Sequence, residues 1–214
     1  MYKIVAIMGK AGSGKDSLMK AILHHDTEKN LNEIISYTTR PIREGEQEGI
    51  NYHYVSNEEF SQLVLENKML EATVFNSWGY GTAINSLNEN KINIGVFNPA
   101  GIESLMKDSR INLKVFYIEA SDKERLIRQL SRESDPNIEE IFRRFKADEI
   151  DFSDLSDFNY TTINNEIKKD FYPAVYAMGR QIRDWADGFN YSIRKTIFSR
   201  QLKILILNIV EEYK

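Results

Sequence analysis

The chain has 214 residues and contains no cysteine, only three histidines and only four prolines. Without cysteine it can form no disulfide, no thiolate nucleophile and no cysteine-ligated zinc site. The histidines, His24, His25 and His53, offer little for a metal centre. Any bound metal ion would therefore be held by carboxylates, hydroxyls or a substrate.

Long apolar segments and an excess of positive charge are also missing. No stretch approaches the roughly 20 consecutive apolar residues that a membrane-spanning helix needs, and the opening MYKIVAIMG has too short an apolar run for a secretion signal. The net charge is −4 and the pI is near 5.6, whereas nucleic-acid-binding domains are usually basic. We therefore expect a cytoplasmic protein that has neither a membrane nor a nucleic acid as partner.

The order of apolar segments predicts the fold class. The apolar run 3–8 ends at a glycine, which is typical of a parallel strand buried on both faces, and residues 17–23 have helical apolar spacing. Further apolar runs at 92–97, 113–120 and 160–164 are separated by helical segments. This alternation predicts a single α/β domain with a mainly parallel sheet flanked by helices.

Two stretches differ from this core. Residues 36–83 are rich in Thr, Arg, Gly, Tyr and Glu and predict a small binding lobe, whereas residues 122–157 are densely charged and predict a helical lid. The core would then consist of residues 1–35, 84–121 and 158–214.

The segment MGKAGSGKDS, residues 8–17, joins the first predicted strand to the first predicted helix. Its glycines allow backbone N–H groups to turn inward around phosphate oxygens, the helix start adds partial positive charge, and Lys15 can reach the outer phosphates. A glycine turn with a surface lysine is the alternative, which the strand and helix on either side disfavour. The predicted nucleotide-binding loop comprises Gly9, Lys10, Ala11, Gly12, Ser13, Gly14, Lys15, Asp16 and Ser17.

Asp16 stands where this pattern has a serine or threonine that contacts Mg²⁺. It is either a helix-start carboxylate that the helix dipole favours, or a group that helps to hold Mg²⁺ through water. We favour the first interpretation, because a carboxylate facing polyphosphate without an intervening cation is repelled. Ser17 then supplies the hydroxyl to the metal.

The next segment, SYTTRPIREGEQEGINYHYVSNEEF at 36–60, carries the pattern Ser-x-Thr-Thr-Arg-x-x-Arg-x-Gly-Glu followed by Gly-x-x-Tyr. It resembles the monophosphate-binding lobe of guanylate kinases, and the resemblance continues through LEATVFNSWGYGTA at 70–83. The resemblance implies a P-loop NTPase core and phosphorylation of GMP or dGMP, with ATP as co-substrate and Mg²⁺ as cofactor. It also implies that Arg40, Arg43, Tyr52 and Tyr80 bind the GMP phosphate, and that Ser36, Glu71 and Thr82 read the guanine.

The chemistry of these residue types agrees with those roles. Guanidinium groups bind a phosphate dianion bidentately, and one carboxylate can accept hydrogen bonds from guanine N1–H and the 2-amino group together. Adenine offers no such pair of donors. A solvated lobe surface for the arginines, and an ordinary surface charge for Glu71, are the alternatives.

The charged segment RLIRQLSRESDPNIEEIFRRF, 125–145, resembles the lid of the same family. The resemblance implies that Arg128, Arg132 and Arg144 close over the ATP phosphates, with Arg143 a weaker candidate; a solvated helix face is the alternative. TTINNE at 161–166 resembles the turn that borders adenine, where Asn164 and Asn165 are candidates. The candidate catalytic residues are thus Lys15, Arg40, Arg128, Arg132 and Arg144.

The sequence also departs from the family. Where guanylate kinases usually carry two aspartates, IGVFNPAG has Val96 and Asn98. Asn98 can still bind GMP through its amide, and we hypothesise that the loss of these carboxylates is linked to the gain of Asp16. A kinase of different or broader base preference, and a non-catalytic guanylate-kinase-like binding module, stay open; the retained glycines and Lys15 disfavour the module.

The segment after residue 166 is longer than one closing helix requires. Its helix-spaced apolar residues favour additional core packing over a dimer or partner surface, and the choice between monomer and homodimer stays open. These residues are Tyr172, Tyr176, Trp185, Phe189, Phe198, Leu202, Leu205 and Ile209.

Overall fold

A computed structural model describes residues 1–43, 45–75, 77–132 and 134–188 of the chain. Its centre is a five-stranded sheet, in which every neighbouring pair of strands is parallel and the order is β2-β7-β1-β8-β9. This confirms the predicted α/β fold with a mainly parallel sheet. The strands are β1 (Tyr2–Met8), β2 (Leu31–Glu33), β7 (Ile92–Val96), β8 (Ile111–Glu119) and β9 (Tyr160–Asn164).

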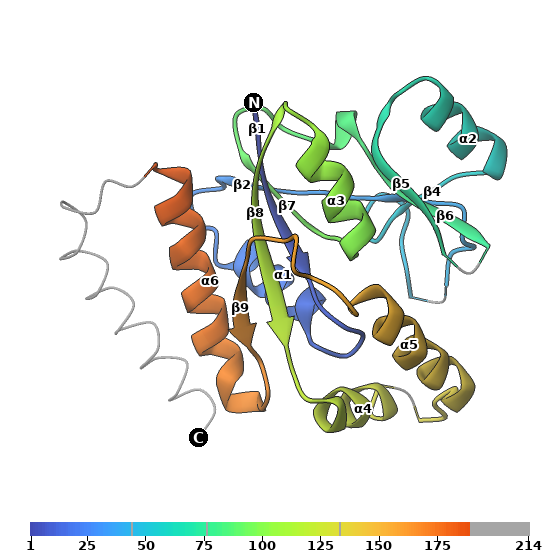
Figure 1. Ribbon diagram of the computed structural model, residues 1–214, viewed down its shortest axis with the longest axis vertical. Coiled ribbons are helices and arrows are strands. Elements are labelled where there is room, and N and C mark those ends of the chain that lie inside the picture. Colours follow the sequence, from blue (N-terminus) through green and yellow to red (C-terminus); the bar gives the residue numbers. More distant parts are fainter. Residues whose placement is uncertain (44, 76, 133, 189–214) are drawn as a thin grey trace.

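Helices cover both faces of this sheet (Figure 1). Successive side chains of a strand point to opposite faces, so the apolar run of β1 supplies two separate hydrophobic clusters. Val5 and Ile7 pack with α1 (Lys15–His24) and α6 (Phe171–Ala186), whereas Ile4 and Met8 pack with α3 (Pro99–Lys107). The uninterrupted apolar sequence of β1 is therefore explained by burial on both sides.

Helix α6 contacts the sheet through one stripe of small and aliphatic residues. Ala174, Val175, Met178 and Ile182 are buried in the cluster that contains Val5 and Ile7. The aromatic residues predicted to pack in the core differ in burial. Trp185 lies against this cluster, whereas 45% of Tyr172 is exposed. Phe189, Phe198, Leu202, Leu205 and Ile209 lie outside the described residues.

A second, four-stranded sheet of order β4-β3-β6-β5 lies within residues 36–83, the range predicted to form a binding lobe. Phe60 of the adjoining helix packs so closely on β6 that a Cβ added at Gly79 would lie 2.8 Å from its ring. Glycine is thus required at this point of the strand. The elements are β3 (Tyr37–Thr38), β4 (His53–Tyr54), α2 (Asn57–Leu65), β5 (Met69–Phe75) and β6 (Trp78–Ala83).

The charged range 122–157 contains two helices, α4 (Asp122–Leu130) and α5 (Ile138–Asp151). Ser121 and Asn137 cap their N-termini by accepting hydrogen bonds from backbone amides, which ends the preceding loops. Short 3₁₀ turns occupy Ile84–Ser86 and Lys168–Asp170. No helix of the described residues is long and apolar enough to cross a membrane.

Asn93 on β7 holds the sheet to the loop before it, and its removal tests this packing. Its side chain is fully buried, donates to the carbonyls of Lys3 and Asn88, and accepts from the Asn32 amide group and the Asn88 backbone amide. Asn93→Ala should lower the free energy of unfolding by about 2 kcal/mol, because buried partners are left unpaired. Urea denaturation measures this loss, and exposed Asn90→Ala is the control. Equal effects of the two variants would show that the buried network contributes nothing.

Candidate active site

The loop between β1 and α1 has the shape that its glycines predict. Gly12 and Gly14 have φ angles of +82° and +89°, in the left-handed region that side chains disfavour. Helix α1 begins at Lys15, directly after this turn. The first backbone amides of an α-helix have no intrahelical partners and carry partial positive charge, so this end of the loop favours an anion.

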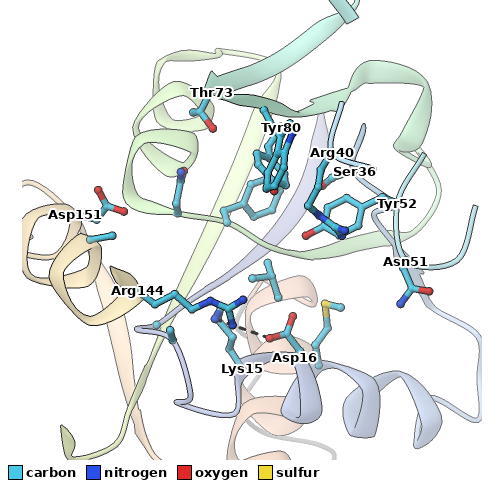
Figure 2. A pocket seen from close by; sticks show the side chains of 18 of the residues that line it. Lys15, Asp16, Ser36, Arg40, Asn51, Tyr52, Thr73, Tyr80, Arg144 and Asp151 are labelled. Atoms are coloured by element: carbon cyan, nitrogen blue, oxygen red, sulfur yellow. Dashed lines mark ion pairs between the residues drawn. The ribbon is translucent and has the colours of Figure 1, made fainter. Parts of the chain in front are cut away.

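A cavity of 660 Å³ lies between this loop, the second sheet and helix α5. Its size is within the roughly 300–1,000 Å³ of small-molecule sites. Figure 2 shows Lys15 and Asp16 on one side of the cavity, with Arg144 reaching toward them and Arg40, Tyr52 and Tyr80 on the other side. The predicted site residues that line it are Gly9, Ala11, Lys15, Asp16, Ser36, Arg40, Arg43, Tyr52, Glu71, Tyr80, Asn98, Arg132 and Arg144.

Arg40 lies in a cluster of aromatic and acidic side chains. Only 4% of the residue is exposed, and its guanidinium carbon lies 5.6 Å from the ring centroid of Tyr52 and 5.7 Å from that of Tyr54. Its Nη2 donates to both carboxylate oxygens of Glu46, at 2.8 and 2.9 Å. A buried cation requires such a partner, so Glu46 keeps Arg40 charged and oriented in the absence of a ligand.

Glu46 also lines the cavity, although the sequence patterns above predict no role for it. Burial alone would raise its pKa, but hydrogen bonds from Arg40, the Arg43 backbone amide and the Tyr54 hydroxyl lower the pKa to about 2. Burial and the bond to Glu46 in turn raise the pKa of Tyr54 to about 12. The motif contains a signal for this role, because Glu46 ends the same Arg-x-x-Arg-x-Gly-Glu pattern that contains both arginines.

The three residues predicted to read guanine lie together. Ser36 and Thr82 have their hydroxyl oxygens 3.4 Å apart, and Thr82 is fully buried behind the cavity. Burial raises the pKa of Glu71 to about 7, although hydrogen bonds from the Thr82 hydroxyl and amide act in the opposite direction. A buried carboxylate with two hydroxyls beside it can accept and donate hydrogen bonds at one edge of a planar base.

Asn98 lines the cavity close to Glu71, but part of its side chain has a structural task. Its Oδ1 accepts a hydrogen bond of 2.8 Å from the Gly101 amide and so caps α3, with Pro99 as the first helical residue. This bond leaves the side-chain amide group as the donor at this position. Val96, the other departure from the family pattern, also lines the cavity and supplies no charge.

Arg132 and Arg144 line the cavity on the side formed by residues 122–157. Together with Arg43 they also line an adjoining pocket of 120 Å³. Arg143 and Arg144 each donate to Glu140, and these bonds lower the pKa of Glu140 to about 2 in spite of its burial. The cations thus converge from the lobe and from the lid on one place.

Arg128 differs from the expectation that it closes over ATP phosphates. It is not among the cavity-lining residues; instead its guanidinium donates to the carbonyls of Ser13, Asn165 and Glu166, at 3.1, 2.7 and 3.0 Å. It therefore joins the loop to the turn after β9 from behind. The charged, helical character of this segment predicts that Arg128 lies on a helix, but it does not predict which side of the helix Arg128 occupies.

The remaining predicted residues of the loop and of the turn after β9 do not line the cavity. Asn164 accepts a hydrogen bond from the Glu166 amide, while its neighbour Asn165 donates to the Ser13 carbonyl at 2.8 Å. Asn165, rather than Asn164, thus contacts the loop. Lys10, Gly12, Ser13, Gly14 and Ser17 form the loop and the start of α1 without lining the cavity.

The groups around the loop limit how a magnesium nucleotide could be held. Asp16 has 59% of its side chain exposed at the cavity, and its Oδ2 lies 3.9 Å from Lys15 Nζ. The buried Ser13 hydroxyl has no hydrogen-bond partner within the described part of the chain. No three His, Asp or Glu side chains of those residues gather into a metal site. Because Mg²⁺ takes one or two carboxylates and otherwise phosphates and water, this donor set fits the ion only together with a phosphate ligand.

Comparisons with known proteins agree with this geometry. The family model described as guanylate kinase matches residues 1–177. The chain belongs to the guanylate kinase family. It is 30% identical over 172 residues to a guanylate kinase of Campylobacter jejuni, covering 78% of this chain and 83% of the relative. It is also 33% identical over 175 residues to a guanylate kinase of Schizosaccharomyces pombe, covering 78% and 85%.

A solved structure shows the same fold. The crystal structure of guanylate kinase from Anaplasma phagocytophilum superposes with a TM-score of 0.63 at 22% identity, and the match covers 89% of this chain and 88% of that one. The two chains therefore share one fold over most of their length.

The raised pKa of Glu71 predicts a pH dependence of stability. A carboxyl group whose pKa rises from 4.5 to about 7 on folding stabilises the native state below pH 4.5, and this contribution is lost as the pH rises to 7. Glu71→Gln removes this pH-dependent loss, so the free energy of unfolding of the variant relative to wild type should increase by roughly 3 kcal/mol between pH 4.5 and pH 8. Urea denaturation at both pH values measures this difference. An NMR titration midpoint near 4.5 for the Glu71 carboxyl group would contradict the prediction.

Proposed function

We propose that this member of the guanylate kinase family transfers the γ-phosphoryl group of ATP to GMP or dGMP, and so forms the diphosphate. One observation carries the proposal. A single cavity is lined by the phosphate-binding loop with Lys15, by the separate phosphate-binding candidates Arg40 and Arg43, and by the carboxyl group of Glu71. Two phosphate sites and one base site in the same cavity suit a nucleotide donor and a nucleotide acceptor.

The acceptor needs no catalytic base. The second pKa of a phosphate monoester is about 6, so the GMP phosphate is already mostly dianionic at pH 7. The task of the protein is to align donor and acceptor and to stabilise charge on the transferred group. Lys15 and the start of α1 hold the donor phosphates, and Arg40 and Arg43 hold the acceptor phosphate.

The arginines of residues 122–157 stabilise negative charge on the phosphoryl group during its transfer. Arg132 and Arg144 lie where the lobe-side Arg43 meets the lid, so all three can surround a phosphoryl group that passes from donor to acceptor. Asp16, through water, and Ser17 are the residues that would hold a bound Mg²⁺, which would neutralise charge on the donor phosphates.

The base is selected at Glu71. Guanine N1–H and the 2-amino group donate to its carboxylate, whereas the Ser36 hydroxyl, which lines the cavity beside the buried Thr82, can donate to O6. An adenine ring would leave these mostly buried groups without partners, which is costly in a site of this kind. Guanine binding also favours the ionised form of Glu71 and therefore strengthens as the pH rises toward 7.

The acceptor specificity tests this proposal directly. Diphosphate formation from ATP and Mg²⁺ is measured with GMP, dGMP, AMP, CMP and dTMP supplied separately. We expect product with GMP and dGMP only, and a loss of roughly 10² to 10³ in turnover for Lys15→Ala, because that cation stabilises the transition-state charge. Turnover of another base would indicate a monophosphate kinase of different preference. No product with any acceptor would support a binding module.

Arg43→Ala tests the acceptor phosphate site. The variant removes one guanidinium from the acceptor side, so the KM for GMP should rise roughly tenfold and kcat should fall, while the KM for ATP stays within about twofold. Steady-state kinetics with each substrate varied in turn measure this separation. Arg110→Ala is the matched control, since Arg110 pairs with Asp108 at the surface and does not line the cavity. Unchanged GMP kinetics in Arg43→Ala would remove Arg43 from the site.

A further inference from the structure

Arg125 on α4 has the largest fully buried side chain in the described part of the protein, and only 2% of the residue is exposed. It lies under the phosphate-binding loop and not in the cavity. Its Nη2 pairs with the carboxylate of Asp148 on α5, its Nη1 pairs with Asp122, and its guanidinium carbon lies 4.4 Å from the ring centroid of Phe145. A buried ion pair often contributes little to the stability of a protein, because removing both charges from water is costly. The burial of Arg125 and Asp148 therefore needs a reason other than stability.

That explanation lies in the contacts of the pair with Ala11. The Ala11 amide donates to Asp148 Oδ2 at 2.9 Å, and the Ala11 carbonyl accepts from Arg125 Nε at 2.9 Å. Gln129 Nε2 approaches the same carbonyl at 3.5 Å. The ion pair therefore holds both peptide groups that flank one residue of the phosphate-binding loop, and fixes their orientation.

The backbone of α4 and the loop also meet directly. A Cβ added at Gly12 would lie 2.7 Å from the Arg125 carbonyl oxygen. The Ala11 amide donates to Asp148 and the Ser13 amide donates to the Lys10 carbonyl, whereas the first amides of α1, at Lys15 and Asp16, have no intrahelical partner and are available to a phosphate. The direction in which these amides point depends on the preceding turn, which the Ala11 contacts hold in place.

We propose that Arg125 and Asp148 are positioning residues, which hold the phosphate-binding loop in its anion-accepting shape through the two peptide groups of Ala11. They act on the donor side of the cavity and not on the acceptor side. The expected change in ATP affinity rests on the proposed kinase function. The expected shape of the loop without a nucleotide does not.

The double variant Arg125→Met/Asp148→Leu tests the proposal. Replacing a buried ion pair by apolar residues of similar volume is often neutral for stability, so this variant should fold while Ala11 loses its two partners. We expect the Kd for ATP, measured by calorimetry without GMP, to rise roughly tenfold, with the Kd for GMP within about twofold. Unchanged ATP affinity, or equal losses for both nucleotides, would overturn the proposal.

Two further variants separate positioning from packing. Asp148→Asn keeps an oxygen that accepts from the Ala11 amide, so its ATP affinity should stay within about threefold of wild type. Asp122→Asn is the matched control, because Asp122 also pairs with Arg125 but is largely exposed and has no contact with Ala11. Its affinity for both nucleotides should match wild type, and a tenfold loss of ATP affinity in it would count against the specific role of Ala11.

Amide hydrogen exchange tests the unliganded loop and needs no nucleotide. In the wild-type protein the Ala11 amide should exchange at least roughly tenfold more slowly than in an unstructured peptide, and Asp148→Asn should preserve this protection. Rapid exchange of the wild-type Ala11 amide would overturn the proposal even if the double variant failed to fold. Slow exchange in a protein that does not bind ATP would leave the loop assignment intact and refute the proposed kinase function.

Discussion

The arginines around the cavity need carboxylate partners. Guanidinium groups that lie close together in a partly buried site repel one another when no phosphate is bound. The structure meets this constraint with one carboxylate at each place. Glu46 pairs with Arg40 on the lobe side, and Glu140 pairs with Arg143 and Arg144 on the lid side. These pairs keep the cations extended toward the cavity, so that an incoming phosphate meets groups that are already oriented.

Two glutamates of the lobe show how environment divides the roles of one residue type. Glu46 receives hydrogen bonds from a guanidinium, an amide and a hydroxyl, which hold its pKa at about 2, whereas burial raises the pKa of Glu71 to about 7. Glu46 is therefore satisfied within the protein, and Glu71 is satisfied only in part. A carboxylate with unused accepting capacity is suited to a base that brings its own donors.

Much of the fold could be predicted from the sequence, since both periodicity and the loop motif are local. The run 160–164 matches β9, and the glycine loop lies between β1 and α1. Side-chain pairs could not be predicted, because no local pattern links Arg125 to the distant Asp148, or Glu46 to Tyr54 within the same segment. Arg128 shows the same limit. The charged segment predicts that Arg128 lies on a helix, but the side of the helix on which it lies depends on where α4 packs against the loop.

The contacts of that helix also constrain how the lid can move. Arg125 and Arg128 of α4 bind loop carbonyls, and Asp148 near the end of α5 binds a loop amide. A movement that preserves these bonds keeps the adjacent parts of both helices with the core. Arg144 lies on the same helix as Asp148 and one turn before it, so the bond from the Ala11 amide to Asp148 also fixes the position of Arg144 relative to the phosphate-binding loop.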